Sequence, residues 1–305
     1  MVELPIIERS IFFGALILYL ASAAVGVRQL SRGQDKYKRF LISLIALAVS
    51  LESVILVFRA VAIQAFPLTG LFESMIVLTV VFGLTFLFVS LAIRQVWFGS
   101  VMAWIIFAMA LLSAVVARPA AQLQTAARTP WIVAHGLAMV LAGAMIAFAA
   151  GTAALFLLGR WKLKQRQIRK LIGKVPNIEK LERMNLFGLK ACLVLMTFGL
   201  VSGIGLAAVK SAVLGISGID WLTDPKIVLI ATAWILLATV LVLRRIVALR
   251  SKMTAYITVA IFLLILFALV GTTVFCGTKH DFSTSEVSRV EGRNNFRKWK
   301  YYLSD

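Results

Sequence analysis

Residues 226–248, KIVLIATAWILLATVLVLRRIVA, decide the structural class of this protein. Between Lys226 and Arg244 the stretch holds no charged side chain, and it is as long as the roughly 20 residues that a helix needs to cross a bilayer. Lipid offers the backbone no hydrogen-bond partner, so a segment this apolar must satisfy its own amides as a helix. The stretch therefore predicts a transmembrane helix that ends near two arginines.

Further runs of the same kind extend this prediction to most of the chain. The protein has 305 residues, of which 61% are hydrophobic, and a soluble domain needs no such apolar surface. The apolar runs fall at about residues 10–28, 40–63, 71–93, 98–117, 131–158, 186–209, 226–248 and 255–275. We therefore expect an all-α polytopic membrane protein with about eight transmembrane helices.

Lysines and arginines are distributed unequally among the connections between these runs. The formal net charge is +19, and the cations gather after the first, third, fifth and seventh runs. The connection between the fourth and fifth runs holds only Arg118 and Arg128. The positive-inside rule then places the basic connections in the cytoplasm and both termini on the extracytoplasmic side. Most of the charge is thus a topology signal, and we expect no nucleic-acid partner.

Two basic segments allow a second interpretation each. Residues 160–183 are expected to orient the chain and to be solvated, although they could bind anionic lipid or a cytoplasmic partner. We divide the chain into an integral membrane domain, 1–283, and a basic, aromatic extracytoplasmic tail, 284–305. The tail would either lie on the outer headgroups or be merely solvated and disordered.

Several unusual residues fall on the expected outer face. The chain has two histidines: His135 lies at the start of the fifth run, and His280 follows the eighth. The polar loop 218–226, GIDWLTDPK, and the segment 66–74, FPLTGLFES, belong to the same face. The dipeptide Asp224-Pro225 also has a plain interpretation, with Asp as a helix N-cap and Pro at the first helical position.

Two imidazoles suit haem iron better than structural zinc. A structural zinc site usually has four protein ligands, whereas two histidines complete the axial set of a haem. Trp131 and Trp221 could form an aromatic wall, and Arg59 and Lys226 could pair with propionates. Each of these residues also has a simpler interpretation. The tryptophans and a single His135 would be interfacial residues, and the cations would be snorkelling side chains.

Glu52 is the notable acid inside a span. It precedes Arg59 by seven residues and shares its helix face, so an internal ion pair is expected. A proton or ion pathway through Glu52 is the alternative. A transporter would be expected to have two matching halves with broken helices, and no internal repeat is evident. No spacing indicates a nucleophilic triad or a phosphate loop, so acid–base or nucleophilic catalysis has little support in the sequence. Whether the protein is an enzyme of another kind stays open.

The motifs on the outer face resemble those of the CcsA/CcmC family of cytochrome c biogenesis proteins. Residues 221–226, Trp-Leu-Thr-Asp-Pro-Lys, resemble the second half of the family's tryptophan-rich WWD segment. Trp131-x-x-x-His135 is similar to the family's W-x-x-x-H at a helix start. His280, followed by Phe282, is similar to the closing H-S-Y of the family.

A further segment, near the second and third runs, resembles the CcsA type in particular. Arg59 and residues 66–74 are similar to its R-W…G-H-x-P-x-x-N-x-Y-E-S. The resemblance implies a haem-binding, haem-delivering protein of system II cytochrome c maturation in the bacterial plasma (inner) membrane. It would work with a ResB/CcsB-like partner and apocytochrome c. The implied site residues are His135, His280, Trp221, Asp224, Pro225, Lys226, Trp131 and Arg59, with both histidines as axial iron ligands.

The sequence also departs from the family pattern. Ala65 takes the place of the first of two membrane histidines of the CcsA type, and the seventh run holds no histidine. Thr223 and Ile227 stand where the WWD segment has Trp and Glu. These departures favour an alternative, a HemX-like relative that regulates or scaffolds without delivering haem.

Overall fold

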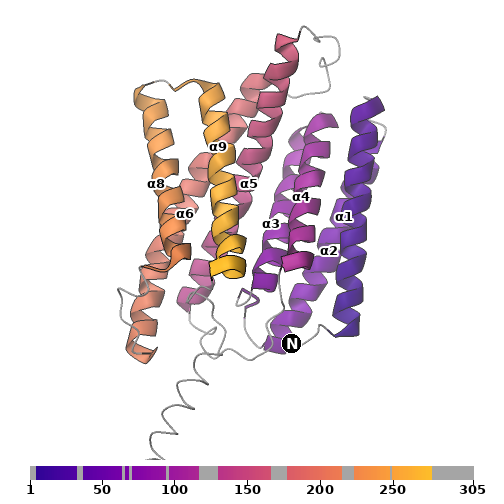
Figure 1. Ribbon diagram of the computed structural model, residues 1–305. Helices are drawn as coiled ribbons and strands as arrows, with labels where there is room; N and C mark the ends of the chain where they lie inside the picture. The colour runs from indigo at the N-terminus through magenta and orange to yellow at the C-terminus, as the bar shows by residue number, and fades with distance from the viewer. Residues whose placement is uncertain are drawn as a thin grey trace, which may run out of the picture.

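The protein folds as a bundle of long helices, shown by a computed structural model (Figure 1). The structure describes residues 5–32, 37–63, 66–68, 71–93, 96–116, 130–165, 177–214, 223–247 and 249–276. The described helices are α1 (Ile6–Arg32), α2 (Lys38–Ile63), α3 (Leu71–Ala92), α4 (Val96–Val116), α5 (Pro130–Lys164), α6 (Ile178–Leu214), α8 (Pro225–Ile246), α9 (Ser251–Leu266) and the π-helix η4 (Phe267–Cys276).

The predicted fold class is confirmed. Within the described ranges there are 8 helices long and apolar enough to cross a membrane, and there is no strand. Successive spanning helices run antiparallel, so the starts of α1, α3, α5 and α8 lie at one end of the bundle, which is the lower end in Figure 1. The sequence assigns this end to the outside of the membrane and the opposite, basic end to the cytoplasm.

The basic connection predicted at 160–183 is partly helical, which corrects that boundary. Arg160, Lys162 and Lys164 continue α5, and α6 begins already at Ile178. Lysine and arginine are good helix formers, and adding a residue to an existing helix avoids the cost of nucleation. Each of these helices therefore joins an apolar run to a charged extension, which lies at the end of α5 and at the start of α6.

Helix α5 lies at the centre of the bundle and joins its two halves. One cluster of buried apolar side chains comes mainly from α1 to α5, and a second comes from α5, α6, α8 and α9. In the most apolar window of α5, 72% of the residues are buried, compared with 17% in α8. The helix that carries His135 is thus also the one most enclosed by its neighbours.

Small residues allow α5 and α6 to approach closely. A Cβ atom added to Gly188 of α6 would lie 2.9 Å from the Cβ atom of Ala149 and 3.0 Å from the carbonyl oxygen of Met145. Lipid chains are as apolar as leucine, so helices in a membrane associate through such close van der Waals packing. The alanine- and glycine-rich sequence of α5 therefore determines its most extensive contact, the one with α6.

The ion pair expected between Glu52 and Arg59 is absent, so that prediction was wrong. The hydroxyl of Tyr19 in α1 donates to Oε2 of Glu52 at 2.9 Å, and both residues are buried. Arg59 lies about 10 Å further along the axis of α2. It pairs instead with Glu73 of α3 and Glu8 of α1. Glu73 and Glu8, on the facing helices, lie nearer to Arg59 than Glu52 does, because Glu52 is two turns away on the same helix.

Candidate functional site

His135 lies half-buried in the second turn of α5, with its imidazole against α6. Its Nδ1 atom is 2.7 Å from the carbonyl oxygen of Gly199. Because a carbonyl oxygen only accepts hydrogen bonds, Nδ1 must carry the proton in this contact. The neutral imidazole then has its lone pair on Nε2, and this is the form in which histidine binds metal ions.

The same carbonyl is held by a second hydrogen bond. The hydroxyl of Ser202 lies 3.0 Å from the Gly199 oxygen and 2.8 Å from the Phe198 oxygen. Ser202 is itself buried. The single hydroxyl proton of Ser202 is shared between these two oxygens, so the Gly199 oxygen accepts from the imidazole and, in part, from this hydroxyl.

Three glycines of α6 lie beneath large side chains of α5; we call Gly199, Gly203 and Gly205 the glycine groove. A Cβ atom on Gly203 would lie 3.0 Å from both Nδ1 and Cε1 of His135. A Cβ atom on Gly205 would lie 2.9 Å from the Trp131 ring. Only glycine leaves room at these positions for the imidazole and the indole to reach the backbone of α6.

The residues that fill the glycine groove stand one turn apart on α5. Trp131, His135 and Met139 lie at i, i+4 and i+8, which places them on one helix face. A Cβ atom on Gly199 would lie 2.7 Å from the sulfur of Met139. The large side chains of Trp131, His135 and Met139 thus pack into the glycine groove of α6. The indole of Trp131 is only partly covered there, since 46% of this residue stays exposed.

The start of α8 brings Lys226 towards the same histidine. The carboxylate of Asp224 accepts from the backbone N–H of Lys226 at 2.9 Å, and Pro225 occupies the first helical position. The helix start predicted from the dipeptide Asp224-Pro225 is thus confirmed. The ammonium group of Lys226 lies near enough to act electrostatically on the imidazole of His135.

The segment between α2 and α3 also packs beside His135. A Cβ atom on Gly136 would lie 2.9 Å from Cδ1 of Leu68, so this leucine rests on α5. Pro67 and Leu68 are buried, whereas 45% of Phe66 is exposed. The Phe66–Leu68 part of the predicted 66–74 segment is therefore next to the histidine, with an aromatic ring at the surface.

Arg59 joins three helices through a buried ionic cluster. Its Nε and Nη2 atoms donate to Oε1 of Glu73 at 3.0 and 2.5 Å, and its Nη1 atom lies 3.7 Å from Oε2 of Glu8. The side chain of Arg59 is 7% exposed and that of Glu73 is 0% exposed. Arg59 therefore has a structural role at this end of the bundle, in addition to any contact with a ligand.

The structure brings together part of the predicted set. Trp131 and His135 pack side by side against α6, and Lys226, at the capped start of α8, acts on His135 electrostatically. Trp221 and His280 lie outside the described residues. Sequence reasoning missed the glycine groove and Ser202, although the spacing Gly199-x-x-x-Gly203 is a known signal for close helix packing. Among the residues described, no group of three or more His, Cys, Asp or Glu could hold a metal ion.

Comparison with known families supports the resemblance of the motifs. A family described as "Cytochrome C assembly protein" matches residues 5–278, which include every described helix from α1 to η4. His280 lies just beyond the matched region. Neither the comparison with curated proteins nor that with solved structures finds a match. Because the match covers nearly the whole chain, this multi-pass membrane protein belongs to the cytochrome c assembly protein family.

Proposed function

We propose that this protein holds haem at the outer face of the bacterial plasma membrane and delivers it to apocytochrome c. Family membership supports a role in c-type cytochrome maturation, and this family is generally associated with haem. One observation carries the finer proposal. The Gly199 carbonyl accepts the Nδ1 proton of His135, so Nε2 of this half-buried ring has the lone pair that iron requires.

The proposal assigns a role to each residue of the set. His135 and His280 would be the axial ligands, and Trp131 and Trp221 would pack against the macrocycle. Lys226 would pair with a propionate, and its position follows from the cap that Asp224 and Pro225 form at the start of α8. Arg59 would contribute positive charge from within its cluster with Glu73 and Glu8.

Haem, when bound, supplies the group that becomes attached to the thiols of the apocytochrome. The residues of this chain bind and orient that group, so we propose holding and presentation as the activity. Residues 1–283 would form the haem-handling membrane domain, and 284–305 would form an extracytoplasmic tail. A ResB/CcsB-like membrane protein would be the partner in attachment.

The absorption spectrum of the purified full-length protein tests the ligand assignment. We expect a low-spin, bis-histidine haem spectrum that is lost in His135→Ala. Added imidazole should restore the low-spin bands in His135→Ala, because it replaces the missing ligand without repairing a folding defect. An unchanged spectrum in His135→Ala would show that His135 is not a ligand.

A regulatory or scaffolding role, as in HemX-like proteins, is the second candidate. The chain has two histidines, and none lies in α8, where the CcsA type has one inside the membrane. A deletion strain separates the two candidates. Under the first, covalent c-type cytochromes disappear, and His135→Ala fails to restore them. Under the second, covalent cytochromes persist, and only their amount or the level of haem changes.

A further inference from the structure

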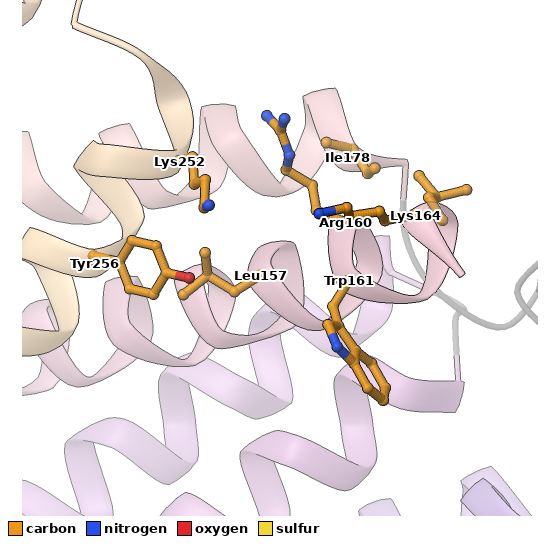
Figure 2. A pocket seen from close by; sticks show the side chains of 8 residues that line it. Leu157, Arg160, Trp161, Lys164, Ile178, Lys252 and Tyr256 are labelled. Carbon is orange, nitrogen blue, oxygen red and sulfur yellow. The ribbon is translucent and has the colours of Figure 1, made fainter. Parts of the chain in front are cut away.

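A cavity of about 570 Å³ lies at the basic end of the bundle, far from His135 (Figure 2). It lies where the end of α5 and the start of α6 meet the start of α9. Lys252 and Tyr256 of α9 lie opposite Leu157 and Arg160 of α5, and Trp161 of α5 also lines the cavity. Its volume falls in the range of about 300–1,000 Å³ that is typical of small-ligand sites.

Three cations line this cavity, and nearby acids do not neutralise them. Arg160, Lys164 and Lys252 form no ion pair with any described residue. The acids at this end are already engaged. Glu182 pairs with Arg244 and accepts from the Ser251 hydroxyl at 2.6 Å, and it reaches Arg160 only through a longer-range attraction. The cavity therefore has an excess of positive charge, which favours an anionic ligand.

The other residues that line the cavity are apolar or aromatic. Trp161 and Tyr256 are 56% and 52% exposed, and rings of this kind suit the layer of lipid headgroups. Lys252 lies over the ring of Tyr256, with its Nζ atom 5.7 Å from the centroid. Leu157 lies one turn of α5 closer to the bilayer core. The site thus combines cations at headgroup depth with apolar surface that continues into the membrane.

We propose that this cavity binds an anionic phospholipid of the cytoplasmic leaflet. Arg160, Lys164 and Lys252 hold the phosphate, and the acyl chains follow α5 and α9 past Leu157 and Tyr256. Basic pockets between transmembrane helices on the cytoplasmic side are suited to such headgroups.

Native mass spectrometry of the full-length protein tests this proposal. We expect phosphatidylglycerol to be retained in preference to phosphatidylcholine. Arg160→Gln and Lys252→Gln should each weaken retention about fivefold, the contribution expected of one cation near a membrane surface. Arg39→Gln is the matched control, since it removes the same charge from an exposed position at the same end of the bundle, on α2.

A second variant separates a built site from general attraction to a basic surface. Leu157→Trp fills the cavity and keeps all three cations, so it should also lose phosphatidylglycerol. The proposal is wrong if Arg39→Gln weakens retention as much as Arg160→Gln and Lys252→Gln do, or if Leu157→Trp retains the lipid. It is also wrong if millimolar inorganic phosphate alone displaces the lipid, because the site would then be one for free phosphate. Lys252 is exposed, so Lys252→Gln is expected to fold.

Discussion

The chemistry of His135 depends on a backbone oxygen of another helix. The Gly199 carbonyl accepts the Nδ1 proton, and Gly203 leaves the space in which the ring lies. Outer-shell partners of this kind orient a ligand and keep it in the required tautomer. Gly203 is therefore a positioning residue, since it acts on the proposed iron only through the imidazole.

Gly203→Ala tests this positioning role. The added methyl group would lie 3.0 Å from two ring atoms of His135, so the ring must move away from the Gly199 carbonyl. We expect haem retention to fall about tenfold, with a shift in the low-spin bands. Absorption spectroscopy and the haem-to-protein ratio measure both effects.

The matched control is Gly99→Ala, because a Cβ atom there meets no other atom within 4 Å. Alanine is the better helix former by about 1 kcal/mol, so Gly99→Ala should keep the spectrum and slightly raise the melting temperature. A Gly203→Ala protein with a lower melting temperature but an unshifted spectrum would indicate ordinary packing instead of positioning.

At the scale of elements, the local sequence at the start of α8 determines the position of Lys226, whose charge acts on His135 of α5. Asp224 caps the helix and Pro225 begins it, and both features are local enough to be predicted. The cap determines where α8 begins, and hence where Lys226 stands relative to His135. The longer extents of α5 and α6 were harder to predict, because the last turn of α5 and the first turns of α6 are charged.

Asp224→Ala removes the cap of α8. We expect the free energy of unfolding to fall by about 1 kcal/mol, since a backbone donor of the first turn loses its acceptor. Thermal unfolding in detergent, followed by circular dichroism, measures the change. Asp224→Asn should retain most of the stability, because asparagine caps equally well. Equal losses in Asp224→Ala and Asp224→Asn would mean that the charge of Asp224, and not its cap, stabilises the protein.

For the whole molecule, the two ends of the bundle carry different chemistry. One end has His135, Lys226 and the cluster of Arg59 with Glu73 and Glu8, and the other has the cationic cavity. The assignment of these ends to the two sides of the membrane comes from the distribution of lysine and arginine. It is a prediction that labelling can test.

Single-cysteine labelling in whole cells tests the orientation, in a background without Cys192 and Cys276. Phe66→Cys, at a position that is 45% exposed, should react with a membrane-impermeant maleimide added outside. Lys252→Cys should react only after the cells are opened, because the basic end faces the cytoplasm. The reverse pattern would invert the topology and move the proposed haem site to the cytoplasmic side.

The ion-pair partners of Arg59 could not be predicted from the sequence. The spacing from Glu52 placed the two charges on one helix face, which is correct, but their partners come from α1 and α3. The arrangement of neighbouring helices is not a local property, so the spacing could not predict it. The order of the apolar runs and the positive-inside rule predicted that the motif residues share one face, but they could not predict which of them pack against α6.

The sequence by itself determined the all-helical membrane class, the eight spans and the capped start of α8. These follow from the length of each apolar run and from the capping side chain before α8, which are local properties. Only the tertiary structure decided that Gly199 meets His135, that Arg59 joins three helices and that three cations share one cavity. Such contacts depend on how side chains of different helices interdigitate, and in lipid small residues and buried polar groups determine that fit.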